Sequence, residues 1–331
     1  MEFNQKKIRK YYSELGFRYI AGSAILLLLI LGIAFLVKKF FPEWLGSIQN
    51  ILLVEMLPRF LIGYPIMVFI ITRMPKAKVI EEHKMPTGKF FIAFIMAYAL
   101  MLVINMAYTI PSSIINVVME GVGFKNINPL ANVVTGTNIF LQIILMVIIA
   151  PICEELIFRK LLIDRAVKHG EGVAVVLSGV LFGLFHGNLA QGLYATGLGM
   201  FFGFIYVRTG RIRYSIFLHM IINFLGSVIA SLVLKYSAIS QLLVSDDILG
   251  WFLENKAGVI LYLGYSILVW GIVIAGVVLW IVFRRRFYLV PVEDNIPKGK
   301  RFSTVVINKG MIVYIAFWVG YAIFSFVRNM V

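Results

Sequence analysis

The sequence predicts an all-α polytopic integral membrane protein, a bundle of about eight to nine transmembrane helices. Of its 331 residues, 60% are hydrophobic and only 14% are charged, and the mean hydropathy of +0.91 is far above that of a soluble domain. Apolar stretches recur at close to the roughly 20 residues that a helix needs to cross a bilayer. Basic residues collect in alternate connecting segments, as they do in membrane proteins.

The apolar stretches predict nine spans, at 19–37, 51–71, 90–110, 138–158, 172–189, 191–207, 214–233, 259–283 and 310–327. The stretches at 172–189 and 191–207 are short and rich in glycine, so eight spans are the alternative, with one segment re-entrant or interfacial. We group the spans into three N-terminal anchor helices within 1–136, a four-helix core within 137–231 and two C-terminal helices within 232–331.

The charge balance predicts the orientation of the chain. There are 31 Lys and Arg residues against 16 Asp and Glu, a formal net charge of +15, which in a soluble protein would suggest a nucleic-acid partner. If the N-terminus is cytoplasmic and nine spans alternate, 24 basic residues lie on the cytoplasmic side and six on the other. We therefore expect a multi-pass protein of the cell membrane with an extracytoplasmic C-terminus, contacts with membrane lipids and no nucleic-acid partner.

Two single residues narrow the chemistry further. Cys153 is the only cysteine, which excludes an intramolecular disulfide and a cysteine-rich metal centre. Arg59 is a basic residue inside a predicted span, four residues after Glu55, and a helix is expected to bring these two together as an ion pair.

A first polar cluster lies in the fourth predicted span. Glu155 and Arg159 are four residues apart, so on a helix they share a face and the guanidinium can neutralise the carboxylate. Glu154 points about 100° away from that face. The pattern predicts Glu155 as an ionised orienting group and Glu154 as an unpaired carboxylate suited to general-base catalysis. A plain charge cluster at a helix end is the alternative.

Two further clusters each contain a histidine inside a span. His186 follows Phe182 by four residues, in a stretch where Gly179, Gly183 and Gly187 would let another helix approach closely. His219 and Asn223 are also four apart and can present two hydrogen-bonding groups, or metal ligands, in one direction. Packing and interhelical hydrogen bonding are the structural alternatives.

Taken together, two carboxylates, two imidazoles and an amide predict a site that activates water and donates hydrogen bonds to an oxyanion. The three clusters reach one depth if the fourth helix continues through Asp164 and Arg165, so that the next helix begins outside the bilayer, or if the spans tilt strongly. We expect that continuation, and a site in the cytoplasmic half that is open to water from that side.

The order of these motifs resembles a known family. Glu154-Glu155-x-x-x-Arg159, Phe182-x-x-x-His186 and His219-x-x-x-Asn223, with the turn Arg208-Thr209-Gly210 between them, are similar to the three motifs of the CAAX prenyl protease and bacteriocin-processing (CPBP, or ABI) family of intramembrane endopeptidases. The resemblance covers about residues 138–231.

The resemblance implies hydrolysis of a peptide bond in a membrane-associated, leader or C-terminal peptide. It implies that Glu154 and His186 activate water, that Glu155 and Arg159 support the site, and that His219 and Asn223 polarise the scissile carbonyl. The substrate, a peptide or protein, would arrive from the bilayer or the cytoplasm. The family is also described as metalloproteases, and a second arrangement has Glu154, His186 and His219 bind a divalent metal such as zinc. We favour the metal-free mechanism.

Three rival functions stay open on the sequence alone. A thiol protease would use Cys153 as nucleophile, although a cysteine in apolar surroundings is usually inert. A proton-coupled transporter could use the same carboxylates and histidines as a relay, but no inverted repeat is visible. A non-catalytic scaffold or bacteriocin-immunity protein is the third.

Overall fold

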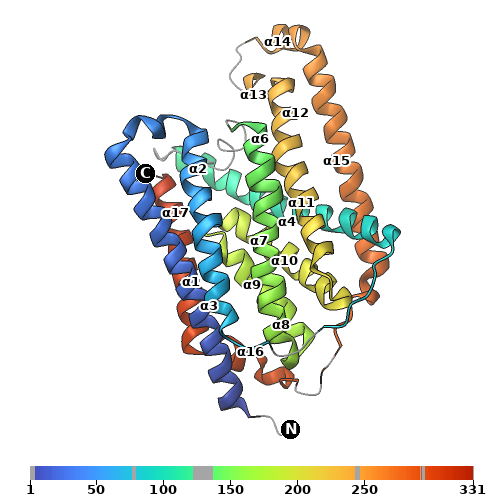
Figure 1. Cartoon of the computed structure of the whole chain (residues 1–331). Coiled ribbons are helices and arrows are strands. Elements are labelled where there is room, and N and C mark those ends of the chain that lie inside the picture. Colours follow the sequence, from blue (N-terminus) through green and yellow to red (C-terminus); the bar gives the residue numbers. More distant parts are fainter. Residues whose placement is uncertain are drawn as a thin grey trace.

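A computed structural model describes residues 4–76, 80–121, 137–242, 247–290, 292 and 295–330, and Figure 1 shows it as a bundle of helices. The prediction of an all-α membrane bundle is confirmed, and no strand occurs among these residues. The elements are α1 (Gln5–Phe40), η1 (Pro42–Gly46), α2 (Ile48–Pro58), η2 (Arg59–Gly63), α3 (Tyr64–Thr72), α4 (Thr87–Gly121), α6 (Ile139–Leu141), η3 (Gln142–Ile149), α7 (Ala150–Glu155), η4 (Leu156–Leu161), α8 (Leu162–Ala166), η5 (Val167–His169), α9 (Glu171–Phe185), α10 (Leu189–Thr209), α11 (Ile212–Asn223), η6 (Phe224–Ile229), α12 (Ala230–Ser237), α13 (Ile239–Leu242), α14 (Ile248–Glu254), α15 (Lys256–Phe283), η7 (Arg284–Arg286), η8 (Lys298–Lys300), α16 (Arg301–Val305) and α17 (Lys309–Met330).

Eight helices of the described chain are long and apolar enough to cross a membrane, and they correspond to eight of the nine predicted spans. The remaining stretch, predicted at 172–189, is the shorter apolar helix α9 of 15 residues, about 22 Å long. The fourth predicted helix runs without a break over Ile139–His169, 31 residues. It therefore includes Asp164 and Arg165, as the depth argument required, and α9 begins beyond its end.

Several of the long helices contain π turns, in which each backbone N–H bonds five residues back instead of four. These segments are η2, η3, η4 and η6. Two of them, η3 and η4, flank the Glu154–Glu155 pair, and η6 directly follows Asn223. π turns are rare in proteins overall, but those that occur are often found at functional sites. Their positions here therefore point to the middle of the bundle as a candidate site.

Helices from the two ends of the chain pack together. α1 lies against α17, where the Gly310 N–H donates to Ser13 Oγ at 3.0 Å and a Cβ at Gly16 would lie 2.4 Å from the Gly310 carbonyl carbon. α4 crosses the bundle obliquely and packs against α10 and α15. The N-terminal end of α1 and the C-terminal end of α17 lie towards opposite ends of the bundle (Figure 1). Helices of all three predicted segments thus share one bundle, and the boundary proposed after residue 136 lies outside the described residues.

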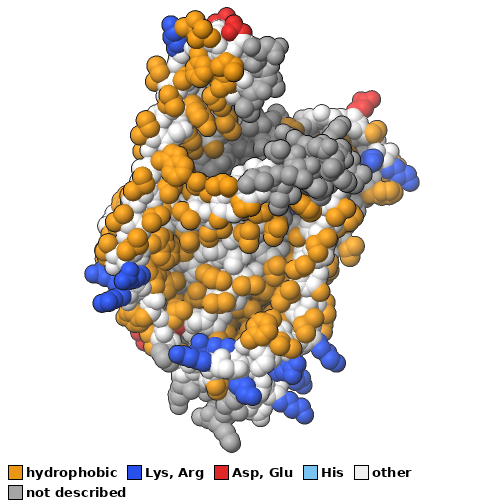
Figure 2. All heavy atoms as spheres, turned by 180° about the vertical axis from the view of Figure 1, so that it is seen from behind, with side chains coloured by type: hydrophobic (Ala, Val, Ile, Leu, Met, Phe, Trp, Pro, Cys, Tyr) orange, Lys and Arg blue, Asp and Glu red, His pale blue; other side chains and the backbone are white. Residues whose placement is uncertain are grey.

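Charge is distributed unevenly along the bundle. Figure 2 shows hydrophobic side chains over the middle of one face and most of the Lys and Arg side chains below them. We call this the basic end; it includes residues 5–18, 208–213 and 295–309. Its loops are tied together, because the His83 N–H donates to the Thr209 carbonyl at 2.8 Å and Arg211 pairs with Glu82 at 3.1 Å.

The glycine-rich segment forms a tight hairpin of α9 and α10. A Cβ at Gly179 would lie 2.8 Å from the Thr196 carbonyl oxygen, and one at Gly183 would lie 2.5 Å from the Gly192 carbonyl oxygen. The predicted close approach is therefore confirmed at these two positions. Gly187 instead forms the turn, with φ of +59°, and Asn188 caps α10 by accepting from the Gln191 N–H at 3.2 Å.

The uneven charge predicts the sidedness of the two termini. In a Cys153→Ala background, Lys7→Cys should be protected from a membrane-impermeant maleimide in intact cells and labelled after lysis, whereas Asn329→Cys, beyond the last span, should be labelled in both. Labelling of Lys7→Cys in intact cells would show that the basic end faces outward.

The hairpin predicts a large effect of one methyl group. Gly183→Ala should lower the free energy of unfolding by about 1–3 kcal/mol, because Cβ overlaps α10. Gly264→Ala in α15 is the matched control, since nothing lies within 4 Å of its Cβ position. Unfolding in detergent measures both. Equal stability of the two variants would mean that α9 and α10 pack less closely at Gly183 than the structure shows.

Candidate active site

The predicted site residues meet near the middle of the bundle. Glu154 and Glu155 lie on α7, halfway along the helix Ile139–His169, and His219 lies on α11. His186 directly follows α9, about 22 Å from the start of that helix. The depths of the three groups along the bundle therefore match, because the fourth helix continues to His169.

The centre of the site is a buried chain of three charged or polar side chains. Arg159 Nε lies 3.0 Å from Glu155 Oε2, and both side chains are fully buried. Glu155 Oε1 lies 3.0 Å from Nδ1 of His219. An ionised carboxylate only accepts hydrogen bonds, so Nδ1 of His219 carries the proton in this pair. The predicted role of Glu155 as a paired, orienting carboxylate agrees with this geometry.

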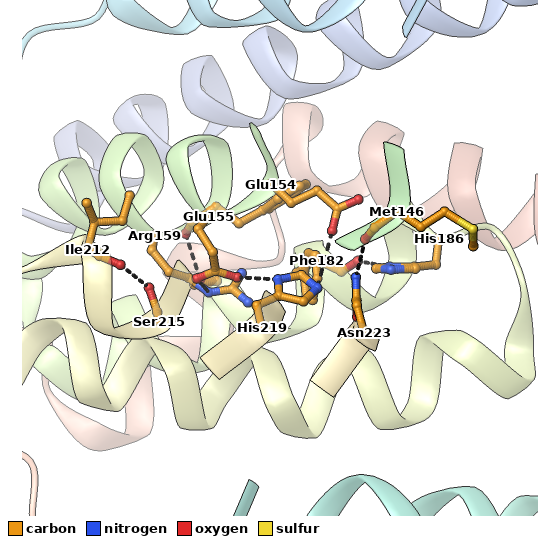
Figure 3. Close-up of polar contacts among 12 residues, drawn as sticks. Met146, Glu154, Glu155, Arg159, Phe182, His186, Ile212, Ser215, His219 and Asn223 are labelled. Atoms are coloured by element: carbon orange, nitrogen blue, oxygen red, sulfur yellow. Dashed lines mark hydrogen bonds and ion pairs between the residues drawn. The ribbon is translucent and has the colours of Figure 1, made fainter. Parts of the chain in front are cut away.

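Glu154 occupies the other side of the same imidazole. Its Oε2 lies 3.8 Å from His219 Nε2, longer than a hydrogen bond, and its side chain is 12% exposed. Figure 3 shows the His219 ring between the two carboxylates, with Glu155 towards Nδ1 and Glu154 towards Nε2. Glu154 is thus free of a guanidinium partner, as the helical spacing predicted.

His186 is oriented by its own helix. Its Nδ1 lies 2.9 Å from the carbonyl oxygen of Phe182, one turn earlier. A carbonyl cannot donate, so Nδ1 is the donor, and in the neutral ring Nε2 keeps its lone pair. The imidazole therefore also satisfies one of the last carbonyls of α9, which ends here.

The ring of Phe182 contacts both histidines and the arginine of the site. Its centroid lies 4.7 Å from that of His186 and 5.8 Å from that of His219, both edge-on. The Arg159 guanidinium lies over the Phe182 ring, 4.3 Å from its centroid, and also over the Phe202 ring, 5.8 Å from that centroid. The two aromatic rings are therefore cation–π partners of the buried Arg159, in addition to its ion pair with Glu155. The motif contains Phe182, but its spacing alone does not predict this central position.

Asn223 reaches back to the helix that carries the glutamates. Its Nδ2 donates to the carbonyl oxygen of Met146 in η3 at 2.8 Å (Figure 3). Two carbonyls of η4 are bonded in the same way by other helices: that of Ile157 accepts from Tyr19 Oη at 2.7 Å, and that of Phe158 from Ser178 Oγ at 2.7 Å. Side chains of three helices thus fix the two π segments on either side of Glu154 and Glu155.

The donor atoms near Glu154 are of the right type for zinc, since carboxylate oxygen and imidazole nitrogen both bind it. Within the described residues, however, no group of three His, Cys, Asp or Glu side chains is arranged so that it could hold a metal ion. Nδ1 of each histidine is hydrogen-bonded, to Glu155 at His219 and to the Phe182 carbonyl at His186, which leaves Nε2 of each ring as the nitrogen that could bind a metal. The donor types therefore suit zinc, but the described side chains are not gathered into a three-ligand site.

One prediction about charge is wrong. Glu55 and Arg59 do not pair: Glu55 is exposed, and Arg59 Nε is buried without a hydrogen-bond partner. Pro58 has no N–H and directly precedes Arg59, whose own N–H donates to the Met56 carbonyl three residues back, so the regular α-helical spacing is interrupted between Glu55 and Arg59.

Comparison with known proteins gives two results. Residues 136–225 match a family described as type II CAAX prenyl endopeptidase Rce1-like. The chain is also similar to a Bacillus subtilis (strain 168) protein named "Putative membrane peptidase YdiL", with 36% identity over 104 residues. That match covers 31% of this chain and 43% of the relative, so the chain spans less than half of the relative's length. No solved structure is significantly similar to this chain.

The buried pair predicts strong coupling between its members. Arg159→Met should destabilise the protein by about 3–5 kcal/mol, because it leaves Glu155 buried without its cation. The double variant Glu155→Gln/Arg159→Met should be less destabilised than the sum of the two single variants, as measured by unfolding in detergent.

Glu82→Gln is the control for this cycle, since it breaks an ion pair whose carboxylate side chain is 65% exposed and should cost under about 1 kcal/mol. If the losses in free energy of unfolding of Glu155→Gln and Arg159→Met simply added up in the double variant, the two residues would not be energetically coupled.

Proposed function

We propose that this chain, whose residues 136–225 form a domain of the CPBP family, is a membrane-embedded endopeptidase that hydrolyses a peptide bond with water activated by Glu154 and His186. The observation that carries the proposal is the position of His219 between two carboxylates, only one of which has a guanidinium partner. A structural charge cluster would not need to leave Glu154 unpaired at membrane depth.

The first step is activation of water. A water between Glu154 and His186 gives one proton to the carboxylate, and its other hydrogen bonds to Nε2 of His186, whose lone pair is free because Nδ1 faces the Phe182 carbonyl. The water oxygen attacks the scissile carbonyl carbon, and a tetrahedral oxyanion forms.

The second step is stabilisation of that oxyanion and departure of the amine. Protonated at both nitrogens, His219 donates to Glu155 through Nδ1 and to the oxyanion through Nε2–H. The Asn223 amide keeps one N–H after bonding to Met146 and is the second donor. Glu154 then transfers its proton to the leaving nitrogen, the C–N bond breaks, and a carboxylic acid and an amine result.

Glu155 and Arg159 are positioning residues in this scheme. Arg159 keeps Glu155 ionised inside the protein, and the ionised carboxylate fixes the tautomer and the orientation of His219. Divalent metal at Glu154, His186 and His219 is the other proposal consistent with the family, but no step above depends on it. We also propose that the peptide or protein substrate reaches the site from the bilayer or from the cytoplasm.

Glu154→Gln tests the proposal, because it keeps the shape of the side chain and removes the base. The membrane peptidomes of cells with this variant should match those of cells without the protein, with a loss of turnover of at least 100-fold. Quantitative mass spectrometry of membrane peptides measures this.

Cys153→Ala is the matched control in the neighbouring position, and it should behave as wild type. Identical peptidomes for wild type and Glu154→Gln would refute the peptidase. Loss of activity in Cys153→Ala alone would favour the thiol mechanism.

A further inference from the structure

Arg59 is a cation in a membrane-spanning helix that none of the steps above uses. It lies 11 residues after the start of the helix Ile48–Thr72. Its Nε is buried and without a hydrogen-bond partner, and no carboxylate of the described residues lies within ion-pair distance. Since an Arg at membrane depth costs about 2.5–3.5 kcal/mol on insertion scales, an unpaired one requires a reason.

Arg59 lies next to Tyr64, whose ring packs against the end of α9. The Tyr64 N–H donates to the Arg59 carbonyl across η2, and the Tyr64 hydroxyl and the Arg59 side chain lie within interaction range of each other. The hydroxyl is buried and makes no hydrogen bond of full geometry. The Tyr64 ring lies 6.2 Å from that of Phe185, the residue before His186. Tyr64 therefore connects the surroundings of Arg59 to the end of α9.

Arg59 also interacts electrostatically with groups at the site. His186 lies within electrostatic range of both Arg59 and Glu154. Tyr64 lies within range of the same two charges. The Arg59 guanidinium and the Tyr64 hydroxyl, which lie next to each other, are thus within electrostatic range of groups that would activate water.

Among the residues that the structure describes, no carboxylate forms an ion pair with this guanidinium. Glu155 pairs with Arg159 and His219. Glu154 has His219 as its ion-pair partner, at 3.8 Å from Nε2, and not Arg59. The planar guanidinium fork matches a carboxylate in a bidentate fashion. An anion that completes the site must therefore come from the bound molecule, and in a peptidase site that molecule is a peptide.

We propose that Arg59, with the Tyr64 hydroxyl beside it, binds a carboxylate of the substrate and so selects peptides with a negative charge near the scissile bond. The inference rests on the proposed peptidase function and gives its substrates a chemical class. Two groups of a peptide have this chemistry, the free C-terminus and an Asp or Glu side chain.

The test uses the purified full chain in lipid nanodiscs and a library of hydrophobic peptides. Each peptide is made with a C-terminal acid or a C-terminal amide, and each amide with Asp or Asn at internal positions. Wild type should cleave the acid forms, or the Asp forms, with a kcat/KM about 10- to 100-fold higher than their neutral counterparts. The pair of peptides that shows the preference identifies the source of the carboxylate.

Arg59→Gln should abolish this preference by lowering kcat/KM only for the charged peptides, while Arg59→Lys should keep part of it, because Lys retains the charge without the fork. Arg73→Gln is the matched control: it lies at the end of the same helix, over the Phe69 ring at 4.4 Å, and should leave the preference unchanged.

Two results would overturn the inference. A preference that survives Arg59→Gln shows that another group binds the charge, and an equal loss for charged and neutral peptides shows that Arg59 acts as a distant counter-charge to Glu154. Thermal unfolding of each variant separates a folding defect from either result.

Binding of the same peptides to Glu154→Gln protein separates the two proposals. If wild type cleaves nothing but the Glu154→Gln protein binds charged peptides in preference, and Arg59→Gln in that background removes the preference, the Arg59 site stands and the peptidase does not. If the Glu154→Gln protein binds charged and neutral peptides equally, the Arg59 site is refuted whatever wild type cleaves.

Discussion

The rest of the site depends on one buried ion pair. Glu155 and Arg159 are both removed from solvent and lie on the same helix, so their distance is set before any other helix packs. Taking two charges out of water is costly, and the cost is recovered only if every remaining polar atom is well placed. His219 uses the second oxygen of Glu155, and Phe182 covers the face of Arg159. The pair thus determines where both imidazoles can lie, although neither carboxylate oxygen of Glu155 faces the proposed water.

Pairs within one helix are the part of the site that could be predicted from sequence. The spacing of Glu155 and Arg159 predicted their contact, and the mismatch in depth predicted that the fourth helix continues past Asp164 and Arg165. Contacts between helices could not be predicted in this way. Nothing in the local sequence indicates that Tyr19 bonds to Ile157 or that Asn223 bonds to Met146, because such partners depend on how distant helices pack. The prediction for Arg59 was wrong because the spacing rule assumes a regular α-helix, and Pro58 interrupts the helix directly before Arg59.

The short helix α9 has a bearing on how water reaches the site. A 15-residue helix ends well inside a hydrocarbon layer about 30 Å thick if it starts at the surface. The turn at Gly187 and Asn188 then places non-helical backbone at membrane depth, which is stable only where protein buries it or water lines it. Asn188 and His186 satisfy part of this backbone with their side chains. A histidine beside such a turn is well placed to meet the water that the proposed hydrolysis would consume.

The π segments on either side of Glu154 and Glu155 make the length of this helix a determinant of the geometry of the site. Each residue of a helix turns the next by about 100°, so the loss of one residue from Gln142–Ile149 would rotate the start of this helix relative to both glutamates. Met146 would then turn away from Asn223 even if every side chain were retained. Among related sequences, a one-residue gap in this helix is therefore a stronger sign of a rebuilt or inactive centre than most substitutions around it. A search for functional relatives should weigh the uninterrupted length of this segment together with the identity of its glutamates.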